Sequence, residues 1–190
     1  MSIDTPLFEG SLVNLGQIDH EKDPETVALW THDAGFMRMM YTDPIRPQSP
    51  WQVKKDLEKL EKSLEEDRNL FHFRIRSRSD DRLLGFAELN WISWTNANGF
   101  IRLGIGAPAD RRKGYGREAL RLLLYYAFVE LNLYRLTALI PEYNLPALAL
   151  FKEFGFSEEV RRRQALERDC CFWDLLHFGL LSNEWKEVQK

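Results

Sequence analysis

The sequence has few of the features that mark several classes of protein. Its 190 residues include 2 cysteines, Cys170 and Cys171, which are adjacent and so suit neither a structural disulfide nor a metal site. A reduced, cytosolic compartment is the simplest interpretation. Residues 1–10 lack a basic start followed by an apolar stretch, so we expect no secretory signal. The densest apolar run, residues 120–133, is interrupted by charged and polar residues and is shorter than the roughly 20 residues of a membrane span.

Charge of one sign is also scarce. The chain has 26 basic and 29 acidic residues and a net charge of -3, which gives no electrostatic footprint for duplex DNA or an anionic membrane. Its 4 histidines are scattered without the spacing of metal ligands. We therefore expect no nucleic acid, membrane or metal partner.

Repeats, low-complexity tracts and linkers are missing as well. Hydrophobic residues make up 44% of the chain and aromatic residues 13%. This composition is typical of a globular protein and excludes disordered, collagen-like and coiled-coil chains. Because domains commonly have roughly 100–200 residues, residues 1–190 are predicted to form one domain.

Hydrophobic periodicity predicts alternating element types. Apolar residues recur at helical spacing from Ser49 to Leu64 and alternate with polar residues from Phe71 to Arg76, as in a half-buried strand. The resulting order predicts one mixed α/β (α+β) domain with helices on both faces of a sheet. The predicted strands cover residues 7–15, 71–76, 83–94, 100–106, 135–140 and the C-terminal region, and the predicted helices begin at Asp23-Pro24 and Ser49 and cover 115–131 and 146–154.

The segment 103–120 carries the clearest chemical signal. A strand ends before Pro108, a basic loop follows, and an apolar helix begins at once. Gly114 and Gly116 let backbone N–H groups converge without side chains in the way, and the helix dipole favours an anion there. The loop therefore suits a phosphate or pyrophosphate, although a helix start with solvated basic residues is the structural alternative. The basic side chains are Arg111, Arg112, Lys113 and Arg117.

Two nucleotide-binding motifs fit this loop badly. The Walker motif needs Gly-Lys-Ser/Thr, whereas Lys113 precedes Gly114 and no hydroxyl follows. A dinucleotide fingerprint starting at Gly104 and Gly106 places Pro108 at its helix start and has no acidic residue about 20 positions on. Neither motif explains the loop.

At this point the sequence resembles the GNAT superfamily of acyl-CoA-dependent N-acetyltransferases. The phosphate loop of that family, Gln/Arg-x-x-Gly-x-Gly/Ala, is matched by Arg-Arg-Lys-Gly-Tyr-Gly at residues 111–116. The family's Asn-x-x-Ala-x-x-Leu-Tyr-x-x-x-Gly-Phe is matched by residues 144–156, except that Phe151 replaces the Tyr. The order of elements, including Trp30 and the closing Asn-Glu-Trp at residues 183–185, is similar to the RimJ/RimL-like branch over nearly the whole chain.

The resemblance implies a mixed, mostly antiparallel sheet that splays into a V-shaped cleft for acetyl-CoA. Gly104 and Gly106 suit a bulge at the splay, and pantetheine is expected along their backbone. The pyrophosphate is expected on the amides of residues 112–117. Asn144 is expected to bond the pantetheine arm, with a helix cap as its structural alternative. The implied cofactor-binding residues are Gly104, Ile105, Gly106, Arg111, Arg112, Lys113, Gly114, Tyr115, Gly116, Arg117, Asn144 and Phe151.

The implied function is acetyl transfer from acetyl-CoA to a primary amine by direct attack in a ternary complex. A protein N-terminal α-amine and a small-molecule amine both stay open, and ribosomal-protein N-termini, polyamines, amino-sugar antibiotics and small amino acids are all candidate acceptors. Dimerisation is common among similar proteins, so a homodimer is expected. An acyl-CoA-binding sensor without useful catalysis and a dinucleotide oxidoreductase are the alternatives.

Glu88 is the predicted general base. It shares strand parity with Leu84, Phe86 and Ile92, and these apolar neighbours are expected to raise its pKa toward the working range of a base. Many similar proteins place a Glu on this strand. A salt-bridged or sheet-edge glutamate is the structural alternative.

The proton donor to the leaving thiolate is where the chain departs from the family. Phe151 stands where many similar enzymes have a Tyr acid, and Ala147 stands where some RimL-like enzymes have a Ser. Neither side chain donates a proton. A thiol pKa near 8.5 makes unassisted departure cost only about 2 kcal/mol at pH 7, so chemistry is expected to be slower but not abolished.

Several other residues are predicted to be structural. His72 is expected to be exposed on its strand, Asp174 to be a paired carboxylate, and Trp30 to lie in the core. Trp91 and Trp94 either line the acceptor side of the cleft or belong to the core.

Overall fold

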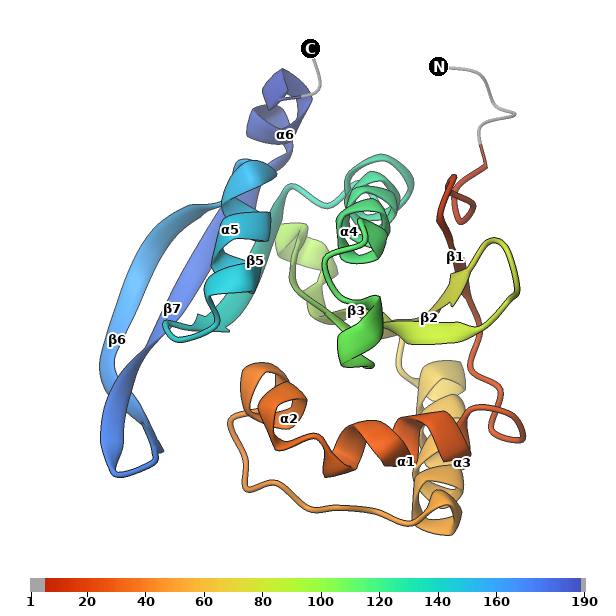
Figure 1. Cartoon of the computed structure of the whole chain (residues 1–190). Helices are drawn as coiled ribbons and strands as arrows, with labels where there is room; N and C mark the ends of the chain where they lie inside the picture. The colour runs from red at the N-terminus through yellow and green to blue at the C-terminus, as the bar shows by residue number, and fades with distance from the viewer. Residues whose placement is uncertain (1–5, 189–190) are drawn as a thin grey trace.

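Seven strands form one mixed sheet in the computed structural model, which describes residues 6–188 (Figure 1). Residues 1–5 and 189–190, which the prediction of one domain includes, lie outside the described residues. Neighbouring strands are antiparallel except β4 and β5. The strand order is β1-β2-β3-β4-β5-β7-β6, with β1 Val13–Gly16, β2 Phe71–Ser77, β3 Leu83–Ser93, β4 Asn98–Ile105, β5 Arg135–Pro141, β6 Ser157–Arg168 and β7 Cys171–Leu181.

Helices cover both faces of the sheet, as predicted (Figure 1). One face carries α4 and α5 and the main apolar core; the other carries α1, α2 and α3. The strand predicted over residues 7–15 is observed only as the shorter β1, Val13–Gly16. The helix predicted over residues 115–131 is observed as α4 followed by wider π-helical turns over Tyr126–Glu130. The helices are α1 Pro24–His32, α2 Ala34–Met40, α3 Pro50–Glu66, α4 Tyr115–Tyr125, α5 Leu145–Glu153 and α6 Ser182–Val188.

The helix starts illustrate how local sequence and long-range contact differ. The helix α3 begins at Pro50, with Ser49 as its N-cap, in agreement with the predicted start, and Ser49 forms a reciprocal capping box with Gln52. The helix α1 begins at Pro24, as predicted, but the side chain of its N-cap residue, Asp23, accepts no hydrogen bond from an N–H of the helix. Instead it lies buried in ion pairs with Arg74 (3.2 Å) and Arg76 (2.7 Å) of β2, because the start of α1 lies within reach of these two side chains.

The prediction of an exposed His72 is wrong. Its side chain is 7% exposed, stacked on the Phe86 ring at 5.6 Å. Polar residues alternating along a strand usually face water, but here α1 to α3 cover that face. Both faces of β2 are therefore enclosed.

The sheet opens between β4 and β5, which confirms the predicted V shape. The two strands pair only at Asn98–Phe100 and Arg135–Thr137, although β4 continues to Ile105 and β5 to Pro141. Beyond Phe100, β4 therefore has one edge free of strand pairing. The Gly106 N–H donates to the Leu84 carbonyl (2.9 Å), so by alternation the N–H groups of Leu103 and Ile105 point to that open edge.

The expected bulge at Gly104 and Gly106 is absent. Pairing with β3 is regular from Phe100 to Ile105, and the register shift lies between Asn90 and Ser93. The absence of side chains at the two glycines instead lets α1 and α2 approach β4 closely. A Cβ on Gly106 would lie 2.0 Å from the Trp30 ring, and a Cβ on Gly104 would lie 2.8 Å from the Met40 sulfur. Trp30 itself is buried in the core, as predicted.

Gly106→Ala should therefore destabilise the fold by about 1–3 kcal/mol, the usual cost of overpacking. Gly16→Ala is the matched control, because its nearest atoms, in Arg76, are 3.9 Å away. Urea unfolding of both variants measures the difference. Equal stability of the two would show that the Trp30 contact does not require a glycine.

Candidate active site

The loop between β4 and α4 presents a set of free backbone N–H groups. After the turn Pro108–Asp110, Arg112 and Gly114 both adopt positive φ (62° and 88°), and α4 begins at Tyr115. Among the hydrogen bonds of residues 6–188, none is donated by the backbone N–H groups of residues 112–117. Successive N–H groups in such a turn, at a helix start, form an anion site.

Buried charge pairing holds this loop in place. Arg82 donates to both oxygens of the buried Asp110 carboxylate, at 2.5 and 3.1 Å. The hydrogen bonds from Arg82 lower the pKa of Asp110, which stays ionised. Lys113 lies 3.8 Å from the same carboxylate. The loop is therefore fixed by contacts that leave its N–H groups free.

The basic side chains of the loop do not act as one cluster. Arg111 turns inward, donating to the carbonyls of Ile105 (3.2 Å) and Gly106 (2.5 Å) and pairing with Asp33 (2.8 Å). This differs from the predicted role of its guanidinium at the phosphate, because the carbonyls at the end of β4 need donors. Arg117 pairs with Glu153 of α5 at 2.5 Å, whereas Arg112 and Lys113 are exposed.

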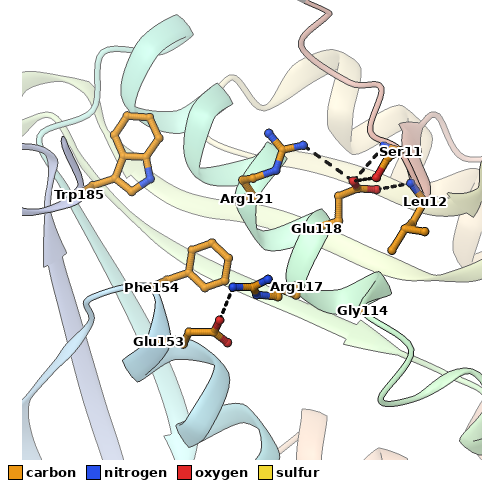
Figure 2. A pocket seen from close by; sticks show the side chains of 9 residues that line it. All are labelled: Ser11, Leu12, Gly114, Arg117, Glu118, Arg121, Glu153, Phe154 and Trp185. Atoms are coloured by element: carbon orange, nitrogen blue, oxygen red, sulfur yellow. Dashed lines mark hydrogen bonds and ion pairs between the residues drawn. The ribbon is translucent and has the colours of Figure 1, made fainter. Parts of the chain in front are cut away.

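A pocket lies beside this loop, between the start of α4 and the end of α5 (Figure 2). Its basic residues are Arg117 and Arg121. The Glu118 carboxylate, 3.9 Å from the Arg121 guanidinium, accepts hydrogen bonds from the backbone N–H groups of Ser11 (2.8 Å), Leu12 (2.6 Å) and Val13 (2.8 Å). Glu118 thus ties the start of β1 to α4. Its partners are backbone groups more than 100 residues away, so no sequence pattern indicates this contact.

The helix α5 occupies the position of the second wall of the predicted cleft. Asn144 caps this helix, accepting from the Ala147 N–H (3.2 Å), and also donates to the Met39 carbonyl of α2 (3.2 Å). A Cβ on Gly116 would lie 3.6 Å from Ile105 and 4.0 Å from Leu150, so Gly116 lies where the two walls approach each other.

Phe151, which is predicted to contact the cofactor, has its side chain turned into the core. Its ring is buried in the core, packed edge-on against Phe156 at 4.9 Å. An apolar ring gains free energy by leaving water, which accounts for its inward position. Ala147 is only half-buried and carries no acidic proton.

A second hollow lies at the point where β4 and β5 diverge. We call it the acceptor hollow, because Trp91, one of the two residues expected to line the acceptor side, lies in its wall. The end of α2 and the following loop cover it, held by bonds from Tyr143 to the Arg38 carbonyl and from Arg168 to the Thr42 carbonyl, both 2.8 Å. Trp91 lines it, whereas Trp94 lines a different hollow. Its lining is Met40, Tyr41, Thr42, Asp43, Asn90, Trp91, Phe100, Ile101, Arg102, Leu139, Pro141 and Leu175.

Glu88 lies next to the acceptor hollow in a polar network. Its carboxylate accepts from Arg102 (2.9 Å), Asn90 (2.5 Å) and His72 (3.3 Å). Burial alone would raise the pKa, but the His72 hydrogen bond and the Arg102 guanidinium outweigh it and lower the pKa of Glu88 to about 2. The expected rise in the pKa of Glu88 is therefore wrong, because the two residues that lower it, His72 and Arg102, come from β2 and β4.

The remaining predicted residues are distributed away from this site. Asp174 is paired with Arg161 at 2.9 Å, as expected. Cys170 and Cys171 are exposed free thiols at the β6–β7 turn. Within residues 6–188, no cluster of three or more His, Cys, Asp or Glu could hold a metal ion. Among the described helices, none has the length and apolar character to cross a membrane.

Comparison with known proteins assigns this geometry to a family. The family "Acetyltransferase (GNAT) domain" matches residues 13–157, so the chain belongs to the GNAT acetyltransferases. It is 35% identical over 107 residues to the probable N-acetyltransferase YjcK of Bacillus subtilis, covering 56% of this chain and 58% of that protein. It is 28% identical over 145 residues to the uncharacterized N-acetyltransferase p20 of Bacillus licheniformis, covering 76% and 77%.

Some of these matches are partial. The matched region spans about half the length of two relatives, 46% of the B. subtilis protein YnaD and 58% of YjcK. Among solved structures, the spermidine N-acetyltransferase of Vibrio cholerae in complex with CoA and spermine superimposes with a TM-score of 0.80 at 20% identity, covering 93% of this chain and 99% of that chain. This likeness confirms the fold.

The ionised Glu88 should make stability depend on pH. Because its folded pKa is lowered from the usual 4.5 to about 2, the carboxylate contributes about 3 kcal/mol above pH 4.5, lost as the pH falls toward 2. Glu88→Gln should therefore be less stable than the natural protein at pH 7, with a deficit that shrinks below pH 4.5.

Urea unfolding between pH 3 and pH 7 measures this deficit. Glu65→Gln, at an exposed position of α3, should differ from the natural protein by less than about 0.5 kcal/mol. A Glu88→Gln deficit that stays constant over this range would contradict the ionised, paired carboxylate.

Proposed function

We propose that the protein transfers an acetyl group from acetyl-CoA to a primary amine by direct attack within a ternary complex. The observation that carries this proposal is the run of free N–H groups at residues 112–117, placed where β4 and β5 diverge. A diphosphate on those amides has its pantetheine arm directed along the open edge of β4. Membership of the GNAT family supports the same function. It gives no support to the alternative function of a dinucleotide oxidoreductase.

The binding roles are assigned by position. The backbone of Gly114, Tyr115 and Gly116 holds the diphosphate. Positive charge around the diphosphate comes from four side chains, Arg112, Lys113, Arg117 and Arg121. Of these, Arg117 and Arg121 line the pocket shown in Figure 2. The edge of β4 at Gly104–Gly106 runs beside the pantetheine, and the Leu103 or Ile105 N–H is placed to polarise the thioester carbonyl. Asn144 stays the N-cap of α5 and so holds the helix that forms the second wall of the proposed cleft.

The reaction balances without another co-reactant. The amine nitrogen forms a C–N bond to the acetyl carbon, the C–S bond breaks, and the proton lost by the amine is matched by one taken up by the CoA thiolate. Deprotonating an α-amine with a pKa near 8 costs about 1–1.5 kcal/mol at pH 7, against about 4–5 kcal/mol for a lysine-type amine. With a pKa of about 2, Glu88 is a weak base. We assign it a positioning role on Arg102 and His72 beside the acceptor.

Three finer assignments belong to the same proposal. Membership of the RimJ/RimL-like branch is supported by the element order and by the two motifs. A homo-oligomer such as a dimer is supported by the dodecameric form of the V. cholerae spermidine N-acetyltransferase. A cytoplasmic location is supported by the free, adjacent cysteines. The V. cholerae complex with spermine makes a small-molecule amine a candidate acceptor alongside a protein N-terminus.

Saturating acetyl-CoA should raise the melting temperature, because a ligand of the native state stabilises it. Gly116→Val should abolish the rise, since its methyl groups fill the narrow space between Ile105 and Leu150 beside the free amides. Gly116→Ala is the matched control: its Cβ fits, and it should keep most of the rise. Thermal unfolding with and without acetyl-CoA measures all three proteins, and no rise in the natural protein would refute the donor site.

Turnover distinguishes an enzyme from an acyl-CoA sensor. Because Phe151 and Ala147 cannot protonate the thiolate, we expect slow but measurable release of CoA thiol when an amine is added. The measurement is thiol release over a panel of α-amines, diamines and amino acids. Binding of acetyl-CoA with no amine-dependent thiol release would favour the sensor.

A further inference from the structure

A cavity beneath α1, α2 and α3 is separate from the donor site. Its volume is about 300 Å³, at the lower end of the range for small-molecule sites. Apolar side chains from the three helices and Phe86 make up most of its lining, and the sheet contributes His72 and Arg74. An apolar chamber with a few polar groups on one wall is the usual form of a ligand site.

Arg74 gives this cavity a positive charge that its shared counter-ion compensates only in part. Its side chain is 4% exposed, and its Nη2 atom has no hydrogen-bond partner among the described residues. Its counter-ion, Asp23, is shared with Arg76, so two guanidinium groups face one carboxylate. Asp56 also lines the cavity but is half exposed and bonded to Gln48. A buried guanidinium with a free N–H is strongly favoured to bind an anionic oxygen.

His72 supplies an acceptor next to that donor. Its Nδ1 faces the Glu88 carboxylate at 3.3 Å, and since that carboxylate is ionised, the proton belongs on Nδ1. Burial lowers the pKa of His72, which keeps the ring neutral. The Nε2 lone pair is buried without a partner. Arg74 and His72 are two residues apart on one strand face, so the wall offers a cationic donor beside a neutral acceptor.

The cavity adjoins the acceptor hollow. Tyr41 lines both, and Arg102, which lines the acceptor hollow, stacks over the Tyr41 and Phe86 rings at 5.0 and 5.5 Å. Arg74 is on β2 and the reacting edge is on β4, two strand spacings or roughly 10 Å apart. A molecule occupying both spaces carries its anionic group at that distance from the reacting amine.

We propose that the acceptor is an amine that also carries a carboxylate, with an N–H group beside that carboxylate. The carboxylate binds the Arg74 guanidinium, the neighbouring N–H donates to His72 Nε2, and the reacting amine lies in the acceptor hollow. A basic α-amino acid acylated on its side-chain amine, or a dipeptide acylated at its N-terminus, has this form. A polyamine has no group for Arg74. This inference rests on the proposed acetyl transfer.

Lysine and 1,5-diaminopentane are the matched probes, because they differ only by the carboxylate. The natural protein should acetylate lysine with a kcat/KM at least tenfold higher than 1,5-diaminopentane. Arg74→Met should reduce that ratio to near one. Arg76→Met is the control: it removes the other guanidinium paired with Asp23 but does not line the cavity, and it should keep the ratio. A ratio within one protein is independent of any general loss of activity.

A binding measurement complements the rates. With CoA bound, lysine should raise the melting temperature of the natural protein and 1,5-diaminopentane should not. If 1,5-diaminopentane is acetylated as well as lysine, or if Arg74→Met keeps the ratio, the carboxylate site is refuted while the transferase stands. If acetyl-CoA does not bind and no amine releases thiol, the transferase proposal fails and this inference with it. If Arg74→Met does not fold, the test is the kcat/KM ratio of lysine to 1,5-diaminopentane in the natural protein: at least tenfold supports the carboxylate site, and a ratio near one refutes it.

Discussion

The structure depends on the early separation of β4 from β5. The two strands share a ladder only at residues 98–100 and 135–137, after which β4 keeps one edge without a strand partner. Because these strands are parallel, the chain must cross over through α4, and the helix start therefore lies beside the opened edge. The free N–H groups of the loop therefore follow directly after the edge of β4 that has no strand partner, and Gly116 lies close to both Ile105 of β4 and Leu150 of α5.

The face of the sheet under α1 to α3 is unusual in its charge. His72, Arg74, Glu88 and Arg102 point into a layer that the helices close, and Asp23 joins them from the start of α1. Buried charges are tolerated only when paired or hydrogen-bonded. Most of these groups are, and the atoms left without hydrogen-bond partners belong to Arg74, His72 and Arg102, of which Arg74 and His72 line one cavity. That imbalance carries the inference of a carboxylate-bearing acceptor.

Local patterns predicted the elements well where one segment determines its own structure. The α3 helix begins at Ser49 with its capping box, and the loop at residues 111–116 turns into α4 with Gly114 at positive φ. Predictions failed where a partner came from elsewhere. The pKa of Glu88 was expected to rise because its own strand is apolar, yet His72 and Arg102 on the two neighbouring strands lower it. Gly104 and Gly106 looked like bulge residues, but they make room for Met40 and Trp30.

The sequence by itself determined the family, the order of elements and the position of the glycine turn before α4, because each is written in contiguous residues with fixed spacing. Only the tertiary structure decided which side chains are free to act. Arg111 is committed to the carbonyls of β4, Phe151 is buried in the core, and Arg74 is buried with an unpartnered N–H. The electrostatic state of a side chain depends on groups within a few ångströms, and in this fold those groups come from segments tens of residues apart.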